Sequence, residues 1–210
     1  MRIPDSIFIL ALISTAVSPC FGSVVYNESV FGDLSNSGLT PTFISVAAGS
    51  NRILGNTGNL DRDYFRITVP VHFELTSIKV QPGTAAGGEF SFIGLQAGNQ
   101  VTVAKNPASA AGLLGWWHYS DGDIGTDILS RMSVPSFGSK GFTAPLGSGN
   151  YAFWIQDFDL GLSPYGFDIN ISQVPLPSAY LGFLFGMGFL GMARNRCAVK
   201  SSDKSRKVYS

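Results

Sequence analysis

The sequence predicts an all-β protein, an antiparallel β-sandwich or jelly roll, with an N-terminal signal peptide and a single C-terminal transmembrane helix added to it. Three observations lead to this fold class. Apolar residues alternate with a period of two through the central part of the chain, which is typical of half-buried strands. The 25 glycines and 11 prolines among 210 residues supply many turns. No helical period of convincing length occurs before residue 179.

The first 22 residues match an export signal. An uncharged apolar run of signal-peptide length follows the basic residue Arg2. Cys20 and Gly22 are small residues at the positions that precede a cleavage site before Ser23, so we expect residues 1–22 to be a signal peptide. Two alternatives remain open, a buried N-terminal helix and lipidation of Cys20.

Residues 23–173 form the expected exported β-sandwich domain. The clearest alternation puts Phe65, Ile67 and Val69 on one face of a strand. In chain order, strands are expected at residues 42–46, 64–69, 75–81, 90–96, 100–104, 113–119, 150–156 and 166–172. Clusters of Gly, Pro, Asn and Asp separate these segments as turns. The body contains no cysteine, and its 151 residues are enough to bury a core without disulfides.

Charges are segregated along the chain, although basic and acidic residues both number 14. The body holds seven basic and twelve acidic residues, a net charge of −5, whereas residues 194–210 hold six basic and one acidic, a net charge of +5. The zero overall charge argues against adhesion of the whole chain to nucleic acid. With only Cys20, Cys197, His72 and His118, a disulfide scaffold and a Cys/His zinc cage are nearly excluded.

The C-terminal part begins with a proline motif followed by an apolar segment. Val174, Pro175, Leu176 and Pro177 precede a stretch without charge that continues to residue 193. The 18 residues from 176 to 193 would form a helix about 27 Å long. This length is close to the ~30 Å of a bilayer core, so we expect a transmembrane helix at 177–193.

A basic tail follows the apolar segment. Arg194 and Arg196 begin it, and positively charged flanks resist translocation across the membrane. Together with the export signal, this charge places the body outside and residues 197–210 in the cytoplasm as a basic tail.

The order of proline motif, glycine-rich apolar helix and basic cluster resembles the PEP-CTERM sorting signal of bacterial exported proteins, in its VPLPA-type variant. The resemblance covers residues 174–196. It implies recognition by an exosortase, an integral-membrane transpeptidase-like enzyme, then cleavage and release or attachment at the cell surface. Leu176 stands where the commonest form has glutamate, and the tail after Arg196 is longer than usual. A plain membrane anchor with a proline-containing linker is the alternative.

Parts of the body resemble bacterial pre-peptidase C-terminal-type sandwich domains. The matching pieces are DRDYFRITVP at 61–70, LTSI at 75–78 and GNYAFWIQ at 149–156. Such domains are generally non-catalytic accessories, and the resemblance implies the same for this chain.

Motifs for catalysis are scarce, so we expect no enzyme. The sequence has no Gly-x-Ser-x-Gly elbow, no phosphate-cradling loop and no His-Glu-x-x-His. His72 is interpreted as a turn residue at a strand end. Asp157 and Asp159 are interpreted as solvated loop residues, not as the paired carboxylates of a glycosidase, and Asp61 and Asp63 as turn residues that begin a strand.

A calcium site is the one cofactor hypothesis. Asp121, Asp123 and Asp127 stand in a glycine-containing loop, and calcium takes about six to eight oxygen ligands around a flexible turn. The loop lacks the glutamate that ends an EF-hand.

Aromatic residues offer a second hypothesis. Trp116, Trp117, Tyr119 and Trp154 present either a sugar-stacking face or ordinary core packing. Trp116 and Trp117 are adjacent, so they point to opposite faces of a strand.

Together these predictions describe an exported protein without catalytic activity. It is anchored in the inner membrane before processing and then resides at the cell surface or in an extracellular matrix. The expected partners are an exosortase-type enzyme, the membrane and exopolysaccharide of a biofilm, and nucleic acid is not expected. The alternative is a carbohydrate- or calcium-dependent binding module.

Overall fold

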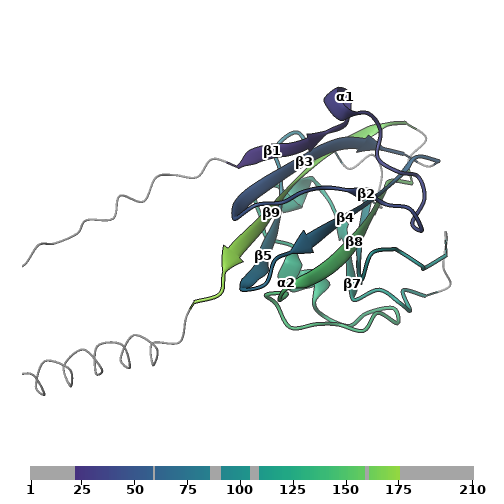
Figure 1. The fold of residues 1–210 in the computed structure, drawn as a ribbon. Coiled ribbons are helices and arrows are strands. Elements are labelled where there is room, and N and C mark those ends of the chain that lie inside the picture. The colour runs from purple at the N-terminus through teal and green to yellow at the C-terminus, as the bar shows by residue number, and fades with distance from the viewer. Residues whose placement is uncertain (1–21, 59, 86–90, 105–108, 159–160, 176–210) are drawn as a thin grey trace, which may run out of the picture. The chain divides into compact units, whose positions relative to one another are not determined.

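The computed structural model describes residues 22–58, 60–85, 91–104, 109–158 and 161–175. The chain divides into two compact units, Met1–Ser172 and Gln173–Ser210. The first unit contains the β domain (Figure 1). Of the second unit, the structure describes only residues 173–175.

The β domain consists of two sheets, which confirms the all-β prediction. The four-stranded sheet has the order β1 (Ser23–Asn27), β3 (Gly49–Thr57), β9 (Ser163–Gln173) and β5 (Phe73–Val80). The five-stranded sheet has the order β2 (Thr42–Phe43), β4 (Arg62–Val69), β8 (Gly149–Gln156), β6 (Ser91–Ala97) and β7 (Gly115–Tyr119). The helices of the described residues are single turns, namely α1 (Glu28–Phe31), α2 (Leu129–Met132) and the 3₁₀ turn η1 (Asp121–Asp123).

The expected purely antiparallel arrangement is wrong at two places. β3 with β9, β4 with β8, and β6 with both β7 and β8 are antiparallel, but β1 pairs parallel with β3 and β2 pairs parallel with β4. Parallel neighbours need a crossover. The chain provides it by running from β1 in one sheet to β2 in the other and back to β3 (Figure 1).

The alternation of apolar residues determines which side chains enter the core. Phe65 and Phe153 face each other across β4 and β8, with ring centroids 4.7 Å apart, and both are fully buried. They belong to one large cluster that also includes Ile53, Ile78 and Phe167 from the strands of the other sheet. The large core therefore lies between the sheets.

A smaller cluster covers the opposite face of the five-stranded sheet. Tyr64 and Trp154 lie there with Val101, Ala110 and Leu113, which come from the segment between β6 and β7. The predicted strand at 100–104 is wrong, because this segment is a loop that packs on the outer face of the sheet. Two strands that the sequence did not reveal, β1 and β3, complete the four-stranded sheet.

His72 is a turn residue between β4 and β5, as expected, with a left-handed φ of 68°. The predicted signal peptide, the transmembrane helix at 177–193 and the tail at 197–210 fall outside the described residues, except for Gly22. Among the described residues, no helix has the length and apolar character that crossing a membrane requires.

Candidate functional site

Alternate residues of neighbouring strands gather aromatic rings on the outer face of the five-stranded sheet. In the strand register, Gly94 of β6 lies opposite both Trp116 of β7 and Trp154 of β8. A Cβ at position 94 would lie 2.9 Å from Cζ of Phe92. The glycine therefore lets the Phe92 ring fold over its own strand, 5.0 Å from the Trp154 ring and 6.1 Å from the Trp116 ring.

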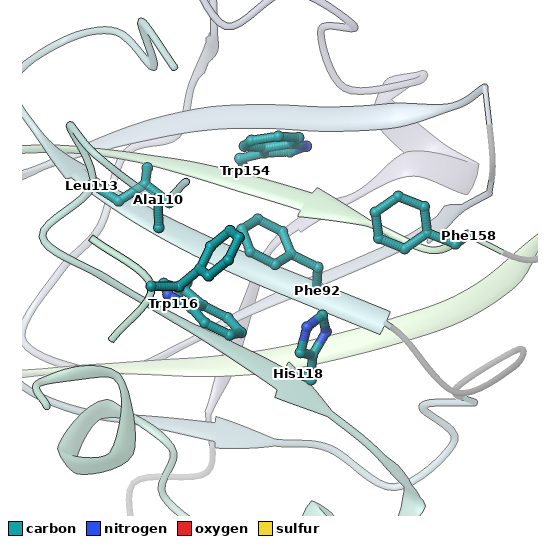
Figure 2. Close-up of a pocket in the computed structure, with 8 residues that line it drawn as sticks. Phe92, Ala110, Leu113, Trp116, His118, Trp154 and Phe158 are labelled. Carbon is teal, nitrogen blue, oxygen red and sulfur yellow. The ribbon is translucent and has the colours of Figure 1, made fainter. Parts of the chain in front are cut away.

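These rings surround a pocket of about 270 Å³ (Figure 2). Ala110 and Leu113 contribute aliphatic side chains, whereas Phe137 and Phe158 are exposed at its edge. The ring of His118 stands 5.0 Å from that of Trp116 in an edge-to-face arrangement. The pocket is thus almost entirely apolar.

A second hollow of about 530 Å³ adjoins the pocket, because Trp116 and His118 line both. Its other lining residues include Trp117, Arg131 and Ser136. The Arg131 guanidinium lies 5.2 Å from the centroid of the Trp117 ring, a cation–π contact. We refer to the two hollows together as the aromatic groove, lined by Phe92, Trp116, Trp117, His118, Arg131, Ser136 and Trp154.

Comparison with protein-family models, with curated proteins and with solved structures finds no match to this chain.

The predicted sugar-stacking residues separate in the structure. Trp116 and Trp154 line the pocket, and Trp117 points to the other face of β7, as expected, but still reaches the adjoining hollow at this sheet edge. Tyr119 is in the core between the sheets, where its ring packs edge-to-face on Phe167 with centroids 5.1 Å apart. The sequence does not point to Phe92, which the strand register places opposite His118.

The aspartates predicted to bind calcium make other contacts in the structure. Asp123 is buried, pairs with Arg131 and accepts a hydrogen bond from the Ser120 backbone N–H at 2.9 Å. Asp127 accepts hydrogen bonds from the backbone N–H groups of Ile78 at 2.9 Å and Leu129 at 3.0 Å. Asp121 is exposed in η1. The carboxyl oxygens of these aspartates are not gathered around one point.

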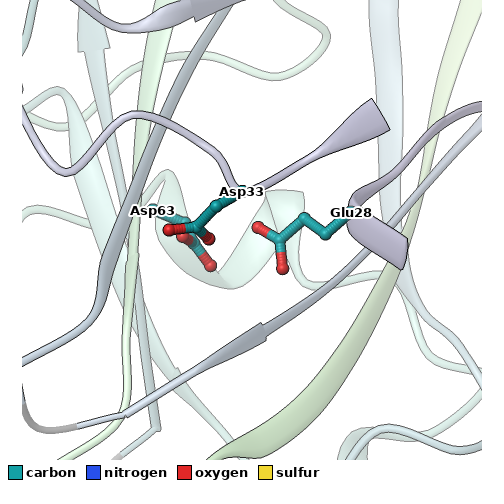
Figure 3. Close-up of side chains that lie close together, drawn as sticks. All are labelled: Glu28, Asp33 and Asp63. Carbon is teal, nitrogen blue, oxygen red and sulfur yellow. The ribbon is translucent and has the colours of Figure 1, made fainter. Parts of the chain in front are cut away.

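The structure instead gathers Glu28, Asp33 and Asp63, with one oxygen of each within 4.8 Å of the others (Figure 3). The interpretation of Asp63 as a turn residue is wrong, because it lies inside β4 and is fully buried. The signal was available in the sequence. Asp63 precedes Phe65, Ile67 and Val69 by an even number of residues, so its side chain points to the same face of the strand, toward the core.

The interpretation of Asp157 as a solvated loop residue is also wrong. The sequence predicts a solvated side chain, but Asp157 is fully buried and accepts a 2.6 Å hydrogen bond from the Ser91 hydroxyl. Its partner in that interpretation, Asp159, lies outside the described residues.

Of the predicted sorting residues, Val174 and Pro175 follow β9 and are exposed. Leu176, Pro177, Arg194 and Arg196 lie outside the described residues.

Proposed function

We propose that this chain is an exported, non-catalytic protein that an exosortase sorts to the cell surface or extracellular matrix, and that its β-sandwich binds exopolysaccharide through the aromatic groove. The aromatic groove is the observation that carries this proposal. It offers several ring faces at one place on the outer face of the sheet.

The chemistry of the groove suits a sugar chain. A pyranose ring has an apolar face of C–H groups, which stacks on aromatic rings such as those of Trp116 and Phe92. Its hydroxyl groups need polar partners at the edge of the stacking surface. Arg131, Ser136 and His118 line the adjoining hollow and supply such partners beside the apolar pocket.

The delivery part of the proposal depends on the sequence. An export signal before Ser23 and the motif from Val174 to Pro177 flank the β domain on its two sides. A protein delivered across the inner membrane and released near polysaccharide would meet the ligand that the groove fits.

Binding of the purified protein to a glycan array and to extracellular polysaccharide tests the proposal. Trp116→Ala should weaken binding by about tenfold or more, because it removes a central stacking surface. Phe43→Ala is the matched control, since Phe43 is an exposed ring of β2 outside the groove. Wild-type protein that binds no glycan, or a Trp116→Ala variant that binds as well as wild type, would overturn the proposal.

A further inference from the structure

Three carboxylates from separate segments converge at one place. Glu28 begins α1, Asp33 lies in the loop after it, and Asp63 belongs to β4 of the five-stranded sheet. Figure 3 shows the three carboxylate groups directed toward one another, and one oxygen of each lies within 4.8 Å of the others. Neither of the ion pairs found in the described part of the chain involves this group. We call it the acidic cluster.

One buried member of the acidic cluster and one buried neighbour of the cluster have no hydrogen-bond partner. Asp63 is 0% exposed, and neither of its carboxyl oxygens has a hydrogen-bond partner. The hydroxyl of Tyr165, a β9 residue that is 2% exposed, also lacks one. The hydroxyl lies near enough to Asp63 to favour the ionised carboxylate, but it makes no hydrogen bond of normal geometry. Unpartnered buried oxygens are costly, so they indicate an additional ligand.

A glycine makes room for this convergence. Gly55 of β3 pairs with Tyr165 in the strand register. A Cβ at position 55 would lie against the Tyr165 hydroxyl and 2.8 Å from the carboxyl carbon of Glu28. Only a residue without a side chain therefore lets the phenol and Glu28 approach the same point.

Burial governs the ionisation of the acidic cluster. Burial, and then the neighbouring Glu28, raise the pKa of Asp63 to about 9. Burial also raises the pKa of Glu28. Without a positive charge nearby, Asp63 therefore stays protonated near neutral pH.

We propose that Glu28, Asp33 and Asp63 bind a calcium ion. The donors are all carboxylate oxygens without histidine or cysteine, which is the ligand set of hard cations. Glu28 is oriented by the backbone N–H groups of Asn56 at 2.7 Å and Leu34 at 3.3 Å. Asp33 is exposed and gives the ion access from solvent, and water completes the coordination shell.

The bound ion has a structural consequence. It joins α1 and the loop that follows it to β4 of the five-stranded sheet. This site shares no residue with the aromatic groove or with the loop at 121–127. The inference therefore stands independently of glycan binding.

Calcium titration of the full-length protein after chelator treatment tests the inference, with thermal melting and isothermal calorimetry as readouts. Calcium at millimolar concentration should raise the melting temperature of the wild type, because a ligand that binds the folded state stabilises it. Asp33→Asn should weaken calcium binding by about tenfold or more, since it removes one of three charged ligands. Asp121→Asn is the matched control, an exposed aspartate of the other acidic segment, and should bind as the wild type does.

Asp63→Asn gives a second test, with a different expected result in chelator. In chelator it should melt no lower than the wild type, because the ion-free carboxyl is protonated and the amide that replaces it is uncharged and of nearly the same size, and calcium should no longer shift its melting temperature. If this variant does not fold, the exposed Asp33→Asn decides. No calcium effect on the wild type would overturn the inference and leave a protonated carboxyl as the state of Asp63. Loss of binding in Asp121→Asn with binding retained in Asp33→Asn would overturn it too.

Discussion

Asn51 holds a turn and two strands together through a single buried amide. Its side-chain oxygen accepts a hydrogen bond from the Ala47 backbone N–H at 2.8 Å. Its amide nitrogen donates to the carbonyl oxygens of Ala47 at 2.8 Å and of Ile169 on β9 at 3.1 Å. The residue is 2% exposed, so water does not replace these partners if the amide is removed.

Asn51→Ala should therefore lower the free energy of unfolding by about 1–3 kcal/mol, because it leaves buried backbone groups without partners. Chemical denaturation measures this loss. Asn99→Ala, at an exposed position, should change the free energy by less than about 0.5 kcal/mol. Equal stability of the two variants would show that the Asn51 hydrogen bonds contribute nothing net.

Gly115 shows the opposite constraint, a position with no room for a side chain. It begins β7, and a Cβ there would fall on the carbonyl oxygen of Met132 at the end of α2. Gly115→Ala should destabilise the protein by about 1–3 kcal/mol, because the backbone of α2 must move. Gly147→Ala is the control, since no heavy atom lies within 4 Å of its added Cβ. Equal melting temperatures of the two variants would contradict this account.

Among the elements, β1 is a weakly secured strand at the edge of its sheet. It pairs only with β3, and none of its five residues is buried, whereas six of the eight residues of β8 are buried between two neighbours. Local opening depends on how much apolar contact must be broken. Hydrogen exchange followed by mass spectrometry should therefore show the amides of β1 exchanging much faster than those of β8. Comparable protection of the two strands would contradict the prediction.

The sequence predicted those elements whose side chains alternate strictly. β4, β8 and β9 were located correctly because Phe65, Phe153 and Phe167 each occur in such an alternation. β3 was missed because Asn51, although buried, is polar, and the strand also holds glycines that break the pattern. The segment at 100–104 alternates too, but its valines cover the outside of a sheet.

Parallel pairing and the functional surfaces could not be predicted in the same way. The strand that pairs with β1 or β2 depends on where the chain comes back to the same sheet after its crossover. The local sequence does not encode that position. The acidic cluster joins Glu28 to Asp63 across 35 positions of the sequence, so only the fold reveals it. The alternation of side chains along β4 indicates that Asp63 is buried, but not which residues surround its carboxyl group.

At the scale of the whole molecule, the two ends of the β domain lie close to each other. Asn51 of β3 pairs with Ser23 of β1 on one side and with Ile169 of β9 on the other. The first residue after the predicted signal peptide and the last strand before the predicted sorting motif are therefore at the same end of one sheet. Removal of either terminal segment leaves every strand of this sheet intact.

This arrangement makes processing at both ends compatible with the fold. Mass spectrometry of the mature protein should find an N-terminus at Ser23 and a C-terminus near Pro177. The double substitution Pro175→Ala and Pro177→Ala should block the second cut while leaving the melting temperature of the β domain unchanged, because both prolines follow the last strand. Pro82→Ala, in the exposed turn after β5, is the control and should leave processing unchanged. Recovery of a chain that still ends at Ser210 from the cell surface would contradict exosortase sorting, since the motif would then serve only as a linker to a permanent anchor.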